Sequence, residues 1–170
     1  MRNEMIIAFD VAYTENFAHV AGVVFENWTS PKAAQTYTLK VQEIAEYESG
    51  QFYKRELPCL LALLQEVKEP IEIIVIDGYV TLGEDQHHGL GQYLYEALDR
   101  KIPVIGVAKN EFKGTPKYCE ILRGLSQKPL YVTAIGIDLD VAKNHVENMY
   151  GKFRIPELLK EVDRLSRAIP

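Results

Sequence analysis

The amino-acid sequence predicts an α/β protein in which one mixed β-sheet carries helices on both faces. Two observations lead to this fold class. The short apolar runs 5–9 and 71–76 have the length and composition of buried strands. The segments 57–67 and 89–100 instead carry apolar residues at helical spacing. Strands that alternate with helices are typical of α/β proteins. A length of 170 residues favours a single domain that spans residues 1–170.

The first part of the chain predicts three antiparallel strands. Residues 5–9 form the first, and the polar turn 14–16 leads into a second at 19–26. After the turn residues 27–31, the alternating pattern of 36–41 predicts a third strand. Strands joined by short turns pair as antiparallel neighbours.

The rest of the chain predicts helices and strands in alternation. The helix 57–67 accommodates Pro58 if this proline lies in the first turn, and the run 71–76 reads as a central strand covered on both faces. His87 and His88 make a poor metal site, because adjacent histidines point in different directions. We predict instead that they lie near solvent at the start of the next helix. The further elements are a helix at 89–100, strands at 104–108 and 130–135, and helices at 138–149 and 156–168. This order is compatible with a ribonuclease H-like fold.

Composition sets limits on location and cofactor. The longest apolar stretches, such as 59–64, are too short to span a bilayer, and the N-terminus lacks a secretory pattern. We therefore expect a cytoplasmic protein with no membrane partner, in which Cys59 and Cys119 are free buried thiols. No dinucleotide-binding or phosphate-cradling glycine loop is present, so no nucleotide cofactor is expected.

Charge is unevenly distributed along the chain. The net charge of −5 alone argues against a polyanionic substrate. Residues 100–128, however, hold seven basic and only two acidic side chains. This segment is either a phosphate-contacting surface or a solvated lysine-bearing loop. Its basic residues are Arg100, Lys101, Lys109, Lys113, Lys117, Arg123 and Lys128.

Three acids stand where the fold would bring them together. Asp10 follows the first apolar run, 5–9, and Asp77 follows the run 71–76. Glu56 stands at the start of the predicted helix 57–67. Acids at the ends of neighbouring strands share one crevice, where their repulsion is costly unless a divalent cation neutralises it. The layout predicts a magnesium-dependent, phosphodiester-cleaving site. For either aspartate alone, an ordinary turn is the competing interpretation.

A set of short motifs resembles the endonuclease V family, the inosine-directed nucleases. The blocks occur in the family's order and span most of the chain. They are F-D-V-A-Y at 9–13, A-H-V-A-G-V-V-F at 18–25, Y-x-x-G-x-x-x-x-R-E at 47–56, I-D-G at 76–78, G-L-G at 89–91, I-G-V-A-K at 105–109, L-D-V-A at 139–142 and R-I-P-E at 154–157. The chain is similar to a divergent and shortened member.

The resemblance implies a role for several residues. Asp10, Glu56 and Asp77 match the family's catalytic carboxylates, which bind Mg²⁺, with Mn²⁺ as a possible substitute. Lys109 matches a lysine that contacts phosphate, and Tyr47 matches the aromatic residue of a strand-separating wedge. Gly78 and Gly89 match glycines beside the pocket for the flipped base. The implied activity is hydrolysis of the phosphodiester bond on the 3′ side of inosine in DNA or RNA.

The sequence also departs from the family pattern. The prolines that flank the wedge Tyr-x pair are replaced by Glu46 and Ser49, and the usual histidine before L-D-x-A is absent. Asp138, or alternatively Asp140, is predicted to supply the missing catalytic and metal-binding group, although either aspartate would also suit a helix N-cap. Two other functions remain open: a nucleic-acid-binding relative that cuts weakly, and a protein that binds a small phosphorylated ligand.

Overall fold

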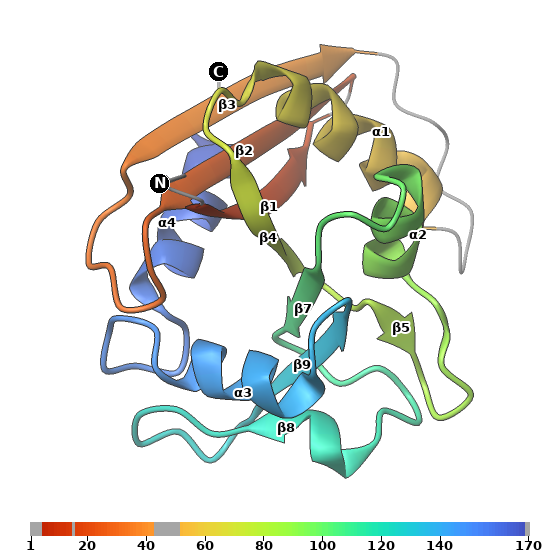
Figure 1. The fold of residues 1–170 in the computed structure, drawn as a ribbon, viewed down its shortest axis with the longest axis vertical. Coiled ribbons are helices and arrows are strands. Elements are labelled where there is room, and N and C mark those ends of the chain that lie inside the picture. The colour runs from red at the N-terminus through yellow and green to blue at the C-terminus, as the bar shows by residue number, and fades with distance from the viewer. Residues whose placement is uncertain (1–4, 15, 43–51, 169–170) are drawn as a thin grey trace.

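A computed structural model describes residues 5–14, 16–42 and 52–168 of the chain. Its main feature is a mixed seven-stranded sheet in the order β3-β2-β1-β4-β7-β9-β8 (Figure 1). The strands are β1 (Met5–Tyr13), β2 (Phe17–Phe25), β3 (Gln35–Gln42), β4 (Ile71–Asp77), β7 (Val104–Ala108), β8 (Glu120–Ile121) and β9 (Leu130–Ile135). The predicted mixed-sheet α/β class is confirmed.

Pairing directions explain how the chain crosses the sheet. β1, β2 and β3 form an antiparallel meander, as predicted. β4 then pairs in parallel with β1, and β7 in parallel with β4. β9 returns antiparallel to β7 and also pairs with the short edge strand β8. Consequently the C-terminal ends of β1, β4 and β7 and the N-terminal end of β9 all lie at the same end of the sheet.

Helices cover both faces of the sheet. α1 (Phe52–Glu66) and α2 (Leu90–Ala97) pack on one face, and α3 (Leu139–Glu147) and α4 (Glu157–Arg167) pack on the other (Figure 1). α4 is strongly amphipathic, because the buried residues Leu158 and Val162 are separated by about one turn while its charged residues face outward. This two-sided cover explains the near-continuous apolar run of β4.

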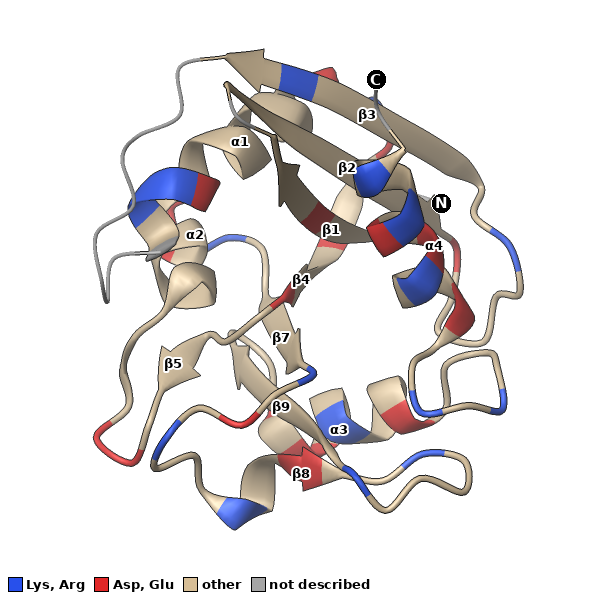
Figure 2. Cartoon of the chain, turned by 180° about the vertical axis from the view of Figure 1, so that it is seen from behind, with Lys and Arg blue, Asp and Glu red and all other residues tan. Residues whose placement is uncertain are grey.

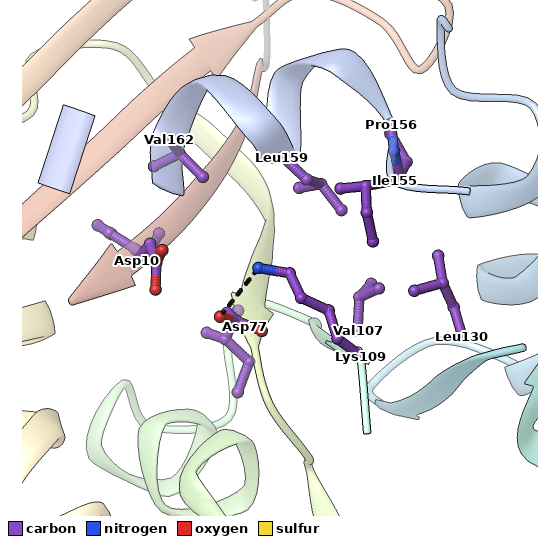
Figure 3. Close-up of a pocket in the computed structure, with 11 residues that line it drawn as sticks. Asp10, Asp77, Val107, Lys109, Leu130, Ile155, Pro156, Leu159 and Val162 are labelled. Atoms are coloured by element: carbon purple, nitrogen blue, oxygen red, sulfur yellow. Dashed lines mark ion pairs between the residues drawn. The ribbon is translucent and has the colours of Figure 1, made fainter. Parts of the chain in front are cut away.

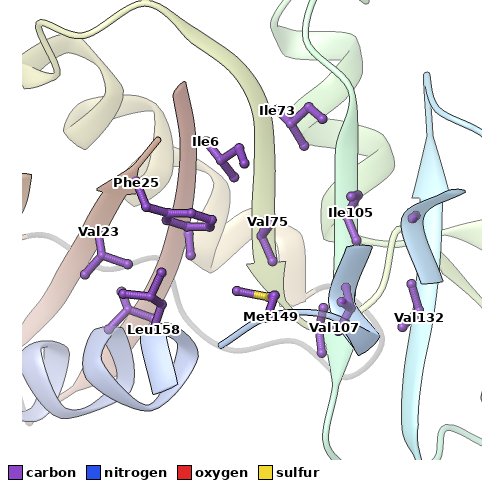
Figure 4. Packing of buried hydrophobic residues seen from close by; sticks show 14 of the residues in the cluster. Ile6, Val23, Phe25, Ile73, Val75, Ile105, Val107, Val132, Met149 and Leu158 are labelled. Atoms are coloured by element: carbon purple, nitrogen blue, oxygen red, sulfur yellow. The ribbon is translucent and has the colours of Figure 1, made fainter. Parts of the chain in front are cut away.

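Two apolar clusters, one on each face, hold these layers together. Alternate residues of one strand enter different clusters, as the period of two requires: Ile6 and Ala8 of β1 pack toward α4, while Ile7 and Phe9 pack toward α1. Figure 4 shows Ile6, Phe25, Val75 and Leu158 meeting in the first of these clusters. Cys59 and Cys119 are buried free thiols, as predicted.

Three parts of the fold differ from the sequence predictions. α1 begins at Phe52, so Pro58 lies inside the helix rather than in its first turn; the helix tolerates it with this residue exposed. His87 and His88 are exposed just before α2, as predicted, but they form the strand β6, which pairs with β5 (Thr81–Leu82) in a small ribbon. Segment 109–129 contains the short helix η1 (Lys117–Cys119) and β8, which the sequence did not indicate. Within the described residues, no helix is long and apolar enough to cross a membrane.

Candidate active site

Strand register brings Asp10, Asp77 and Lys109 to one face of the sheet. Phe9 of β1 is paired with Ile76 of β4, so the next residues, Asp10 and Asp77, lie side by side. Asp77 is in turn paired with Val107, two residues before Lys109. Because alternate residues of a strand share a face, Lys109 points to the same side as Val107 and Asp77. Figure 3 shows the three polar side chains beneath α4, and Figure 2 shows the matching charges on β1, on β4 and just after β7.

Glu56 reaches the same region from α1 on the opposite face. It is spaced four and seven residues before Leu60 and Leu63, which pack against the sheet, so its side chain starts from the inward stripe of the helix. Glu56, Asp10 and Asp77 line one small hollow near the C-terminal ends of β1 and β4, and its other walls are apolar. Those walls are Phe9, Val11, Leu60, Ile76 and Leu90. The three acids therefore line the same hollow, although they come from opposite faces of the sheet.

Burial and the neighbouring Asp77 raise the pKa of two of the acids, Asp10 and Glu56. The pKa of Asp10 rises from 3.8 to about 7, first because the carboxyl is buried, with 9% of the residue exposed, and then because Asp77 lies beside it. The Val11 N–H, which donates to Asp10 Oδ1 at 2.9 Å, and the charge of Lys109 oppose this rise. The pKa of Glu56 also rises to about 7, through burial and then through Asp77. A cation bound here would relieve the repulsion.

Lys109 partly neutralises the cluster. Its Nζ lies 3.7 Å from Asp77 Oδ2, with about a third of each side chain exposed (Figure 3). Among the described residues, no three His, Cys, Asp or Glu side chains are already gathered as ligands of one ion. The donors nevertheless suit Mg²⁺ or Mn²⁺, because all three are carboxylates that repel one another around one hollow. The ammonium group and a divalent cation would compete for Asp77.

The segment after Asp77 offers its backbone to solvent. Gly78 has φ +139°, which favours glycine, and a side chain built on it would meet no atom within 4 Å. Gly89 lies nearby, since a side chain there would come within 2.7 Å of the Tyr79 carbonyl oxygen. The glycine at 89 thus allows residues 79–80 to lie against the start of α2. The two glycines assigned from the resemblance are together, with Gly78 facing open space.

Tyr79 is a site residue that the sequence did not single out. Its hydroxyl donates to the Asn110 carbonyl at 2.7 Å and accepts from the Phe112 N–H at 3.0 Å. These bonds tie the chain after Asp77 to the chain after Lys109. Its position in the I-D-G-Y sequence was the available signal, but its partners are more than thirty residues away.

The basic segment does not form one surface. Arg123 is buried, and its guanidinium donates to backbone carbonyls, so it is unavailable to a phosphate. Arg100 pairs with Glu96 at the end of α2 and, with Lys101, precedes β7, at the opposite end of that strand from Lys109. Lys128 remains beside the site, because its Nζ donates to Asn110 Oδ1 at 3.2 Å. Lys113 and Lys117 are exposed on the intervening segment, which Figure 2 shows extending away from β7.

Asp138, which was assigned as a metal ligand, is not brought to this hollow. Asp138 caps the N-terminus of α3, where its Oδ1 accepts from the N–H groups of Asp140 and Val141 at 2.9 and 3.3 Å. It follows the end of β9, and antiparallel pairing places that end beside the start of β7, away from Asp77. Asp138 therefore acts as the helix cap that was its alternative role, and Asp140 lies in the same turn. Tyr47 lies outside the described residues.

Comparison with known proteins identifies the relatives of this chain. Residues 1–164 match the Endonuclease V family. An endonuclease V from Streptomyces avermitilis is 31% identical over 95% of this chain and 79% of its own length. A crystal structure of endonuclease V from the same organism superposes with a TM-score of 0.75 at 27% identity, covering 98% of this chain and 81% of that chain.

A further structural neighbour binds nucleic acid. The Ciona intestinalis endonuclease V, as its D234N form in complex with a 23mer DNA that contains an inosine followed by a ribo-adenosine, superposes with a TM-score of 0.77 at 21% identity. The match covers 96% of this chain and 84% of that chain. These likenesses confirm the predicted ribonuclease H-like fold class, and the family match supports a nuclease. The chain belongs to the endonuclease V family.

Proposed function

We propose that this chain is a divalent-metal-dependent endonuclease that hydrolyses the phosphodiester bond on the 3′ side of inosine in DNA or RNA. The single observation that carries this proposal is the convergence of Asp10, Glu56 and Asp77 on one hollow beside Lys109. We further propose that it works as a single domain in the cytoplasm, with Mg²⁺ as the natural cofactor and Mn²⁺ as a substitute.

The three acids would hold the metal. Bound there, Mg²⁺ would supply Lewis-acid stabilisation of the leaving oxygen and lower the pKa of a water for attack on phosphorus. Asp10 contributes a carboxylate fixed by its bond from the Val11 N–H, whereas Asp77, with 38% of its side chain exposed, faces the incoming substrate. Glu56 closes the hollow from the α1 side. Asp138 is left out of this ligand set.

Lys109 and the backbone at Gly78 would contact the nucleic acid. The Lys109 ammonium, which lies 3.7 Å from Asp77 Oδ2, would contact a phosphate, as a flexible point charge suits. The open surface at Gly78 permits a base or sugar to approach the main chain closely. We assign inosine as the base because the sequence motifs resemble those of inosine-directed nucleases and because the Ciona endonuclease V is in complex with a DNA that contains an inosine. Tyr47 is kept as the candidate wedge residue.

The test is a cleavage assay with matched substrates. The protein is incubated with single-stranded and duplex DNA and RNA that carry either inosine or adenine at one position, in Mg²⁺, Mn²⁺ or EDTA. We expect a nick on the 3′ side of inosine that needs the metal and disappears in Asp77→Asn. Asp99→Asn makes the same chemical change at an exposed position before the start of β7 and should cut normally. A product that forms equally in EDTA would contradict the proposal.

One observation favours the weaker-cutting alternative. Among the described residues, no three carboxylates lie close enough together to hold one metal ion. Asp77 pairs with Lys109. A nucleic-acid-binding relative would bind inosine-bearing strands with an affinity insensitive to EDTA and yield no nick. A protein for small phosphorylated ligands would bind with little salt dependence, because it releases few counterions.

A further inference from the structure

Arg154 joins three separate backbone positions around the site. Its Nη2 donates to the carbonyl oxygens of Lys109 and Pro129, the latter at 2.8 Å, and its Nε donates to the Lys128 carbonyl oxygen at 3.1 Å. Lys109 follows β7, while Lys128 and Pro129 precede β9. One planar guanidinium therefore fixes the end of one strand to the start of its antiparallel neighbour. A flexible ammonium cannot reproduce such a fork.

A second arginine holds the loop that carries Arg154. The Arg123 side chain is buried, with 6% of the residue exposed, and donates to the carbonyl oxygens of Met149 at 2.7 Å, Gly151 at 2.8 Å and Phe153 at 2.9 Å. It also donates to the carbonyl oxygen of Arg154 itself at 3.3 Å. These hydrogen bonds hold the main chain of the loop between α3 and α4, including the main chain of Arg154.

The consequence falls on Lys109. This residue, Asp10 and Asp77 line a second hollow beneath α4, together with Leu130 and Ile155, the residues that follow Pro129 and Arg154 (Figure 3). The carbonyl oxygen that Arg154 holds belongs to Lys109 itself, so the bond fixes the main chain from which the lysine side chain starts. Loss of the guanidinium would free the main chain that carries the ammonium group facing Asp77.

We propose that Arg154 is a positioning residue that holds the Lys109 main chain so that its ammonium faces Asp77 and, during the reaction, the phosphate. This inference rests on the proposed function for the phosphate contact only. Arg154 touches neither carboxylate nor substrate in this role; it acts through Lys109. Its effect should therefore vanish when the Lys109 side chain is removed.

The first experiment measures the position of Lys109 without any substrate. Lysines of the full-length protein are labelled with a limiting amine-reactive ester, and the rate at each lysine is read by peptide mass spectrometry. Arg154→Gln should raise the rate at Lys109 by about threefold relative to Lys113, the scale expected when a partly exposed ion pair is released. Arg100→Gln, which removes an exposed arginine paired with Glu96, should leave the ratio unchanged.

Folding is checked by thermal melting. Should Arg154→Gln fail to fold, Arg154→Lys takes its place, because it keeps the charge but loses the three-way fork, and its Lys109 rate should also rise. A wild-type labelling rate at Lys109 in a folded Arg154 variant would overturn the inference. This readout stands even if the protein cuts no nucleic acid, so a failure of the proposed function is recognised separately.

The second experiment is a double-mutant cycle on kcat/KM for the inosine substrate, or on affinity if cutting is slow. Lys109→Ala and Arg154→Gln should each weaken the reaction, whereas the combined variant should be no weaker than Lys109→Ala alone. Arg154→Lys should recover part of the loss. Fully additive effects would show that Arg154 acts independently of Lys109 and would reject the positioning role.

Discussion

Replacing Asp10 with asparagine should make the metal-free protein more stable at neutral pH while destroying its activity. Asparagine keeps the shape of the side chain, and its Oδ1 can still accept the Val11 N–H. The change removes only the ionisable proton and the charge. The expected gain in stability measures how strongly the fold opposes an ionised carboxylate at this position.

The sign and size of the effect follow from the pKa of Asp10. The folded protein holds this proton up to about pH 7, whereas the unfolded chain releases it near 3.8. Between these values the folded state binds more protons, so the free energy of unfolding falls as pH rises and becomes constant above about pH 7. A shift of this size corresponds to about 4 kcal/mol in total, or about 1.4 kcal/mol per pH unit. Glu56 adds a slope of the same sign.

The assay is urea denaturation in EDTA at pH 5, 6, 7 and 8. The free energy of unfolding of the wild-type protein should fall across this range. For Asp10→Asn the slope against pH should be smaller by the contribution of about one proton, and the remaining slope should come from Glu56. Asp99→Asn is the matched control, because this exposed residue has φ +57°, a conformation that asparagine also tolerates. If metal-free wild type instead became more stable from pH 5 to pH 7, or if Asp10→Asn kept the full slope, the assignment of a repelling buried cluster would be wrong.

Three other predictions test the same site. Asp77→Asn should abolish cleavage in the nicking assay with little change in melting temperature, since it relieves repulsion while removing a ligand; an active variant would refute the site. Lys109→Ala should weaken binding equally across sequences and flatten the slope of log affinity against log salt by about one unit, as measured by fluorescence anisotropy; an unchanged slope would exclude a phosphate contact. Calorimetric titration should show Mg²⁺ affinity rising with pH up to about 7 and then levelling off, because the ion must displace protons from Asp10 and Glu56; a pH-independent affinity would place the metal elsewhere.

Local patterns were enough to predict most of the fold. The strands β4, β7 and β9 and the helices α3 and α4 lie close to their predicted ranges, because each carries a clear apolar pattern between breakers, whereas β1 begins as predicted but runs on to Tyr13. The predictions were wrong where tertiary contacts decide. α1 extends before Pro58 because its inward stripe packs on the sheet, and the β5 and β6 ribbon forms from two residues in each strand, too few to show a period.

The site was predictable as far as its acids follow apolar runs or lie on the inward stripe of a helix. Asp77 does end its strand, as its apolar run predicts, but β1 continues past Asp10 to Tyr13, because residues 11–13 still pair with β2. The two acids are neighbours through strand register, Phe9 being paired with Ile76. The charges of segment 100–128 could not be sorted in the same way. Whether an arginine faces a phosphate or carbonyl groups, as buried Arg123 does, depends on partners more than twenty residues away.

Strand direction explains why Asp138 looked like a ligand and is placed as a cap. Asp10, inside β1, and Asp77, the last residue of β4, meet because these strands run parallel and Phe9 is paired with Ile76. β9 runs the other way, so the residues that follow it lie at the far edge, and only those that precede it, Lys128 and Pro129, reach the site. On the α4 face, the residues that approach Asp10 and Asp77 therefore come from the start of β9, such as Leu130, and from the chain before α4, such as Ile155, which follows Arg154.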